Sequence, residues 1–131
     1  MWGAIKIVLL VLVLLAGLTL GLSEWGEVVV LRPLGDEPGS ETRLWVVDLD
    51  DGPWLRGSPD KGWAEAAVMA GRAELRRDGT WNRYRVYDVP GPLARNQVNA
   101  AMREKYGFSD RFIGWTEDFG QARPIRLEPI P

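Results

Sequence analysis

The sequence predicts a mainly β protein of the α+β class: a small antiparallel β-barrel with two short helices, preceded by one apolar N-terminal helix. Six short runs are predicted to be strands, because most of them contain β-branched or aromatic residues and each is bounded by turn-forming residues such as Gly, Pro, Asp or Ser. Two other segments have apolar residues at helical spacing. Residues 1–22 carry one charged side chain, Lys6.

The apolar N-terminal segment is long enough to cross a bilayer if the Lys6 amine extends to the surface. We expect residues 1–23 to form a single-pass membrane anchor and residues 24–131 to form the barrel domain. A cleaved signal peptide and a buried helix are the alternatives. Lys6 precedes the apolar run and Glu24 follows it, so the positive-inside rule favours an extracytoplasmic domain.

The first three expected strands are residues 27–32, 43–48 and 54–58. Residues 34–42 (LGDEPGSET) have the composition of a loop, and the acidic residues 48–52 fit a turn between the second and third strands.

The first expected helix, residues 63–70, follows Ser58-Pro59-Asp60, which supplies capping and first-turn residues, and Gly71 can end it. The second expected helix is residues 93–106, with Gly107 at its end. Its apolar stripe contains Ala94, Val98, Ala101 and Met102.

The clearest hairpin joins residues 72–77 to residues 80–87 through Asp78-Gly79, the dipeptide preferred in two-residue type I′ turns. Such a turn pairs Arg77 with Thr80 and Glu74 with Arg83. One face of this hairpin is expected to be buried and contains Ala73, Leu75, Tyr84 and Val86. The solvated face contains Glu74, Arg76, Trp81, Arg83 and Arg85.

Residues 124–128 form the last expected strand, and hairpin connections between most strands favour a closed barrel.

The composition excludes several kinds of chemistry. The chain has no cysteine and no histidine, so disulfides, thiolate sites, imidazole metal sites and the Ser-His-Asp triad are excluded. The net charge is −2 and the pI is about 5.2, which argues against a general affinity for nucleic acid.

The acidic stretch DLDDG, Asp48 to Gly52, resembles part of a calcium loop, but the acids do not alternate as such a loop requires and no Glu follows at the right distance. We therefore interpret it as a hairpin turn and expect no metal site.

If the turn has an even number of residues, one face of the hairpin carries two arginines, two tryptophans and a serine: Arg43, Trp45, Trp54, Arg56 and Ser58. This face fits a phosphorylated aromatic ligand. The alternative is a face where Trp and Arg only cover neighbouring strands. The opposite face, with Leu44, Val46, Leu55 and Gly57, is expected to be core.

The order of these motifs resembles that of the flavin- and deazaflavin-binding split β-barrel proteins, which include pyridoxamine-phosphate-oxidase-like proteins and the deazaflavin-dependent nitroreductase family. The resemblance rests on VVVLRPLGDEPGSETRLWVVDLDDGPWLRGSPDKGW, the Asp78-Gly79 hairpin, Lys105-Tyr106-Gly107 and Ile125-Arg-Leu-Glu-Pro129, and it covers residues 28–129.

The resemblance implies a homodimeric oxidoreductase in which bound FMN or F420 transfers hydride. It implies a cofactor site made by Arg43, Trp45, Arg56, Ser58, Lys61 and Trp63, and it assigns no catalytic side chain. Deazaflavin-binding relatives tend to have a basic loop where this chain has Asp36 and Glu37. A barrel that has lost the cofactor and binds a partner or small molecule is therefore the main alternative. A nucleic-acid module using Arg76, Trp81, Arg83 and Arg85 is a weaker one.

Overall fold

The computed structural model describes the backbone of residues 2–23, 26–35, 40–59, 62–114 and 118–131, and the side chains of these residues except 2 and 15–23. Six strands and four α-helices are present in this part of the chain. The elements are, in order, α1 (Trp2–Ser23), β1 (Val28–Pro33), β2 (Thr42–Leu49), β3 (Gly52–Gly57), α2 (Gly62–Ala70), β4 (Arg72–Arg77), β5 (Thr80–Asp88), α3 (Pro92–Tyr106), α4 (Phe108–Gly114), a 3-10 turn η1 (Phe119–Gln121) and β6 (Arg123–Pro129).

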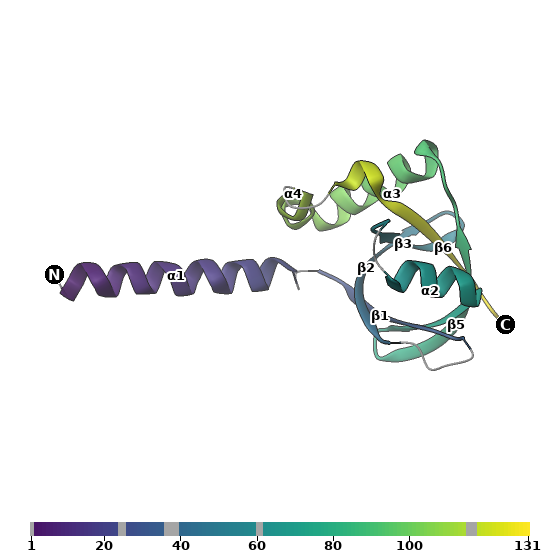
Figure 1. Ribbon diagram of the computed structural model, residues 1–131, viewed down its shortest axis with the longest axis horizontal. Coiled ribbons are helices and arrows are strands. Elements are labelled where there is room, and N and C mark those ends of the chain that lie inside the picture. Colours follow the sequence, from purple (N-terminus) through teal and green to yellow (C-terminus); the bar gives the residue numbers. More distant parts are fainter. Residues whose placement is uncertain (1, 24–25, 36–39, 60–61, 115–117) are drawn as a thin grey trace.

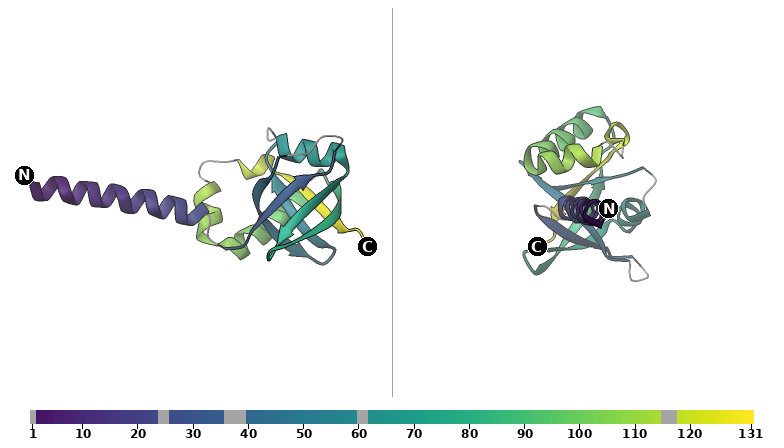
Figure 2. Two further views of the ribbon diagram at one scale, coloured as in Figure 1. Left: turned by 90° about the horizontal axis from the view of Figure 1, so that it is seen from below. Right: turned by 90° about the vertical axis from the view of Figure 1, so that its left-hand side faces the viewer.

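The strands close into an antiparallel barrel in the order β1-β2-β3-β6-β5-β4 (Figure 1). The barrel predicted from the sequence is therefore confirmed, with all six strands at the expected places. Helix α1 extends away from the barrel, and α3, α4 and η1 lie together on one side of it (Figures 1 and 2).

The β4–β5 hairpin has the predicted register, with Arg77 opposite Thr80 and Glu74 opposite Arg83. Asp78 and Gly79 both have positive φ, 52° and 77°, as a type I′ turn requires. Ala73, Leu75 and Val86 are buried as predicted, whereas Tyr84 of the same face is only half-buried and packs against the core. On the outer face, Glu74 forms its ion pair with Arg32 of β1 at 3.1 Å.

The DLDDG stretch is the turn of the β2–β3 hairpin. Leu49 pairs with Gly52, so the loop is the two residues Asp50 and Asp51, and the even-numbered loop is confirmed. The carboxylate of Asp51 accepts a hydrogen bond of 2.6 Å from the Trp54 indole, and Asp48 pairs with Arg77.

Two apolar clusters lie on opposite faces of the β2–β3 hairpin. The barrel interior is filled by side chains from all six strands and by Ala64 and Ala67 of α2, and it includes Val46 and Leu55 as predicted. The second cluster lies outside the barrel, where α3 covers the hairpin. It consists of Val47, Trp54, Ala94, Val98, Met102 and Tyr106. Helix α3 therefore turns the outer face of the hairpin into a second core.

The prediction of only two helices after the N-terminal one was wrong, because α4 follows α3 directly. Gly107, with a φ of 56°, breaks the helical path, and Arg111 N–H then donates to the Gly107 carbonyl as a new helix begins. Seven residues with an irregular apolar pattern carry too little periodicity to predict such a helix.

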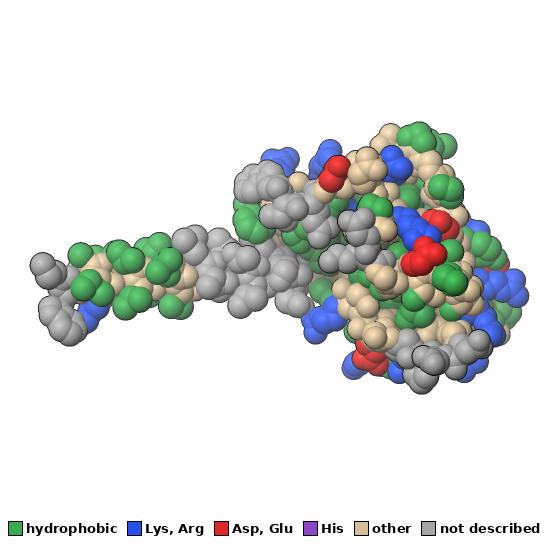
Figure 3. Space-filling view, viewed as in Figure 1, with side chains coloured by type: hydrophobic (Ala, Val, Ile, Leu, Met, Phe, Trp, Pro, Cys, Tyr) green, Lys and Arg blue, Asp and Glu red, His purple; other side chains and the backbone are tan. Residues whose placement is uncertain are grey.

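The apolar side chains of α1 are exposed over the part of the helix where side chains are described, Gly3 to Leu14 (Figure 3). Ile5 and the apolar residues from Ile7 to Leu14 are between 47% and 68% exposed. Among the fully described residues, no helix combines the length and apolar character needed to cross a membrane.

Candidate functional site

The β2–β3 ladder ends where Val46 pairs with Leu55. The residues of β2 that precede Val46 pair with β1, whereas the residues of β3 that follow Leu55 pair with β6. Arg43 and Trp45 thus lie on one arm and Arg56 and Ser58 on the other. The predicted site residues share the outer face of the hairpin, but the strand pairing does not continue between them.

Side chains from α3 and α4 contact both arms. The Trp45 ring stacks on Tyr106 of α3, with centroids 4.2 Å apart and planes 8° apart. On the other arm, the Arg56 guanidinium donates a hydrogen bond of 2.5 Å to Asp110 of α4, and it lies 3.6 Å from the centroid of the Phe119 ring. Asn99 of α3 fixes this arrangement, because its amide donates to the Phe119 carbonyl at 2.9 Å.

The ion pair between Arg56 and Asp110 is buried, with 8% and 3% of the side chains exposed. Burial of two charges requires that they neutralise each other. Arg56, predicted as a phosphate ligand, is therefore engaged by a carboxylate in this structure.

The remaining predicted site residues lie nearer the surface. Arg43 is exposed on β2, and Ser58 is half-buried at the end of β3. Trp63 of α2 packs against the barrel core. Lys61 lies outside the described residues, as do Asp36 and Glu37 of the acidic loop.

The corner between β3 and α2 is tightly packed at Gly57. A Cβ built there would lie 2.9 Å from the Ala64 Cβ and 3.2 Å from the Trp63 ring. Only glycine lets the strand approach the helix so closely. This close packing brings the end of β3 next to Trp63 of α2.

A polar network joins the segment after α1 to the barrel. Arg77 of β4 donates to both carboxylate oxygens of Glu27 at 2.8 and 3.0 Å, and it also pairs with Asp48. Lys105 donates to Glu27 at 2.7 Å. The hydrogen bond from Arg77 is the main cause that holds the pKa of Glu27 below its ordinary value, and it has the same effect on the pKa of Asp48.

Tyr106 completes this network from α3. Its hydroxyl donates to the Glu27 carbonyl at 2.6 Å and accepts from the Val46 N–H at 3.0 Å. Burial raises the pKa of this hydroxyl, so it remains protonated as a donor. The sequence pattern did not predict these roles of Glu27, Arg77, Lys105 and Tyr106, although two of these residues belong to the Lys105-Tyr106-Gly107 motif.

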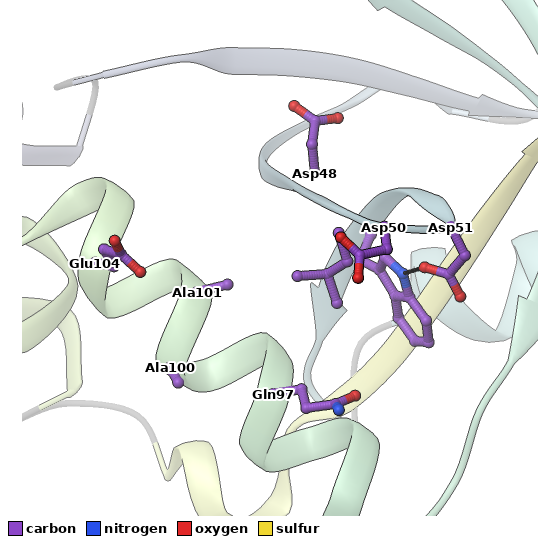
Figure 4. Close-up of a pocket in the computed structure, with 9 residues that line it drawn as sticks. Asp48, Asp50, Asp51, Gln97, Ala100, Ala101 and Glu104 are labelled. Atoms are coloured by element: carbon purple, nitrogen blue, oxygen red, sulfur yellow. Dashed lines mark hydrogen bonds between the residues drawn. The ribbon is translucent and has the colours of Figure 1, made fainter.

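An open groove of about 650 Å³ lies between the β2–β3 turn and α3 (Figure 4). Asp50 and Asp51 line it from the turn, and Gln97 and Glu104 line it from α3. Trp54 forms part of its wall. Carboxylates dominate its charge, so this groove repels a phosphate group.

A second pocket, of about 360 Å³, lies between α3, α4 and η1 and is lined by Arg103, Asp110, Arg111, Gly114 and Phe119. Its two arginines are exposed, whereas its carboxylate is buried against Arg56. Among the described lining residues, the accessible charge of this pocket is therefore positive. The sequence pattern did not predict this pocket, because Arg103 and Arg111 lie on different helices.

Several solved structures share this fold. They include the heme storage protein HutZ from Vibrio cholerae (TM-score 0.61, 13% identity, 84% of this chain and 86% of that one). They also include a putative pyridoxamine 5′-phosphate oxidase from Listeria innocua (TM-score 0.58, 14% identity, 89% and 94%) and an FAD-binding protein from Mesorhizobium loti (TM-score 0.59, 15% identity, 82% and 83%). The chain has the split β-barrel fold. The predicted resemblance is thus confirmed at the level of fold, and no protein-family model and no curated protein sequence matches the chain.

Proposed function

We propose that this protein is a membrane-anchored split-barrel oxidoreductase that binds a flavin-type cofactor, FMN or F420. The observation that carries the proposal is the likeness of almost the whole chain to solved proteins named as a pyridoxamine 5′-phosphate oxidase and an FAD-binding protein. The heme storage protein shares the fold as well. This chain has no histidine and no cysteine, the side chains that most often hold haem iron, so flavin fits its composition better.

Four of the six cofactor-site residues predicted from the sequence would hold the cofactor. Arg43 and Ser58 can bind a phosphate, Lys61 follows Ser58 closely in the sequence, and Trp63 can border a ring. Arg56 and Trp45 do not fit this role, because Asp110 and Tyr106 engage them within the chain. A bound flavin supplies hydride transfer, and the protein's part is to bind and orient it.

The test is a separate titration of the full chain in maltoside micelles with FMN and with F420, followed by cofactor fluorescence. We expect micromolar saturation by one of them, and a loss of about tenfold in affinity in each of Ser58→Ala and Lys61→Ala. Arg83→Ala, at an exposed position of β5, is the matched control and is expected to bind as the wild type does. Absence of binding to either cofactor contradicts the proposal.

A barrel without cofactor that binds a partner or a cationic small molecule is the second candidate. The acidic groove beside the β2–β3 turn favours it, because the carboxylates that line this groove give it the wrong charge for a flavin phosphate. This candidate becomes the leading one if neither cofactor binds and wild type and Lys61→Ala behave alike in redox assays.

The proposal includes α1 as a single-pass anchor, with the barrel domain at residues 24–131 on the extracytoplasmic side. The uncharged run from Ile7 to Leu22 and the exposure of the described apolar side chains support it. Resistance of the full chain to alkaline extraction from membranes tests the anchor, and protease accessibility in intact cells tests the side. Release by alkali contradicts the anchor.

The proposal also includes a homodimer, as expected from the resemblance to split-barrel proteins. Native mass spectrometry of the full chain released from micelles distinguishes a dimer from a monomer. A monomer at all concentrations contradicts this part of the proposal.

A further inference from the structure

The basic pocket between α3, α4 and η1 plays no part in the proposed cofactor site. Within the part of the chain that the structure describes, the side chains of Arg103 and Arg111 have no hydrogen-bond or ion-pair partner. This distinguishes them from Arg32, Arg77 and Arg123, which all pair with carboxylates. Two like charges that line one small pocket repel each other, and an anion bound between them removes that repulsion.

The backbone holds these two arginines on the same pocket. Arg103 lies in the last turn of α3, and the positive φ of Gly107 starts α4 in a new direction. Arg111 of α4 therefore lines the same pocket as Arg103, although a continuous helix would place it about 12 Å further along the axis.

Among the described residues that line the pocket, none adds an accessible negative charge. Asp110 lines the pocket, but its carboxylate is 3% exposed and is neutralised by Arg56. Arg56 also lies against the ring of Phe119. The backbone carbonyl of Phe119 accepts a hydrogen bond from the Asn99 amide. A third guanidinium thus lies behind the pocket wall.

We propose that Arg103 and Arg111 form a binding site for a phosphate group carried by a phosphate ester. Planar guanidinium groups bind phosphate oxygens through paired charge-assisted hydrogen bonds, and two of them neutralise a phosphate monoester. The volume of about 360 Å³ accommodates a phosphate with a small esterified group.

The position of the pocket indicates two sources for this phosphate. Helix α4 contacts α1 and lies beside its C-terminal end (Figures 1 and 2). Phe108, the first residue of α4, is 57% exposed. If α1 crosses the bilayer, as proposed above, the pocket lies at the level of the lipid headgroups, which carry phosphate esters. A soluble phosphate ester is the other source.

The test uses the full chain in maltoside micelles, which contain no phosphate, and a double variant Arg103→Gln/Arg111→Gln. Calorimetric titration with glycerol phosphate measures binding of a soluble ester. Native mass spectrometry after addition of phosphatidylglycerol measures retention of a lipid phosphate. We expect wild type to bind in at least one arm and the double variant to lose about tenfold in affinity or retention.

The matched control is Arg83→Gln/Arg85→Gln, which removes the same charge from the exposed face of β5. Retention of lipid alone assigns the site to headgroups, and binding of glycerol phosphate alone assigns it to a soluble ligand. No binding by wild type in either arm, or equal losses in both double variants, overturns the proposal. The lipid arm rests on the proposed anchor, whereas the glycerol phosphate arm does not. Neither arm contains a flavin, so the outcomes of both arms are independent of the FMN and F420 titrations.

Discussion

The guanidinium of Arg56 and the carboxylate of Asp110 form a buried ion pair that joins β3 to α4 across 54 positions of the sequence. Phe119 and Asn99 complete its surroundings, so the barrel, α3, α4 and η1 meet at this point. Arg56 thus links the barrel to its outer helices.

The first prediction concerns this ion pair. Arg56→Ala leaves the Asp110 carboxylate buried without its cation, and we expect the free energy of unfolding to fall by about 3–5 kcal/mol. Urea unfolding of the full chain in micelles measures it. Arg83→Ala on the exposed β5 face is the control and is expected to change stability by less than about 0.5 kcal/mol. Equal effects of the two substitutions would show that the ion pair does not stabilise the fold.

The close approach of β3 to α2 leads to a second prediction. Gly57→Ala places a methyl group 2.9 Å from the Ala64 Cβ, so strand and helix must separate, and we expect a loss of about 1–3 kcal/mol. Gly62→Ala is the matched control, because no atom lies within 4 Å of its added Cβ and alanine favours the helix. It is expected to leave stability unchanged or raise it slightly. Thermal unfolding of both variants measures this difference in stability. A Gly57→Ala variant as stable as the wild type would contradict the close packing.

A third prediction is a pH dependence that requires Arg77. The pKa values of Glu27 and Asp48 are lower in the folded chain than their ordinary values of 4.5 and 3.8. Their ion pairs therefore stabilise the fold fully above these ordinary values, and the stabilisation is lost as the pH falls through the lower folded values. We expect wild type to exceed Arg77→Gln in melting temperature most clearly near pH 7.

This difference in melting temperature is expected to narrow below about pH 4, where the carboxyls of the wild type become protonated. Arg83→Gln is the control, and its difference from wild type is expected not to follow this pH range. A gap between wild type and Arg77→Gln that stays constant from pH 7 to pH 3 would contradict the assignment.

The fourth prediction concerns the hydroxyl of Tyr106. Tyr106→Phe removes the donor to the Glu27 carbonyl and the acceptor of the Val46 N–H, both in a buried setting. We expect a loss of about 1–3 kcal/mol in the free energy of unfolding. Tyr87→Phe is the control, because among the described contacts its ring lies under Arg126 and its hydroxyl has no partner. Urea unfolding that gives equal values for the two variants would contradict the role of the Tyr106 hydroxyl.

Local pattern was sufficient to predict the barrel. The Asp78-Gly79 turn determines the β4–β5 register, because two-residue loops admit few backbone conformations and side chains alternate along a strand. The same reasoning predicted the β2–β3 hairpin and the inward positions of Val46 and Leu55. Helix α3 was predicted from its spacing of apolar residues.

The candidate site depended on contacts between distant segments. The sequence predicted that Arg43, Trp45, Arg56 and Ser58 share a face of the hairpin, but not that α3 covers part of it. Tyr106 and Asp110 engage Trp45 and Arg56 from positions that follow the hairpin by about fifty residues or more. The pocket of Arg103 and Arg111 likewise exists only because Gly107 redirects the chain.

The sequence by itself thus determined the strands, their turns, the inner core and the apolar N-terminal helix, because each follows from periodicity and turn chemistry within a short segment. Only the tertiary structure decided which outward side chains are covered, which charges are paired and which arginines remain open to an anion. Those outcomes depend on where helices dock against the barrel, and docking is the summed effect of many contacts between segments that are remote in sequence.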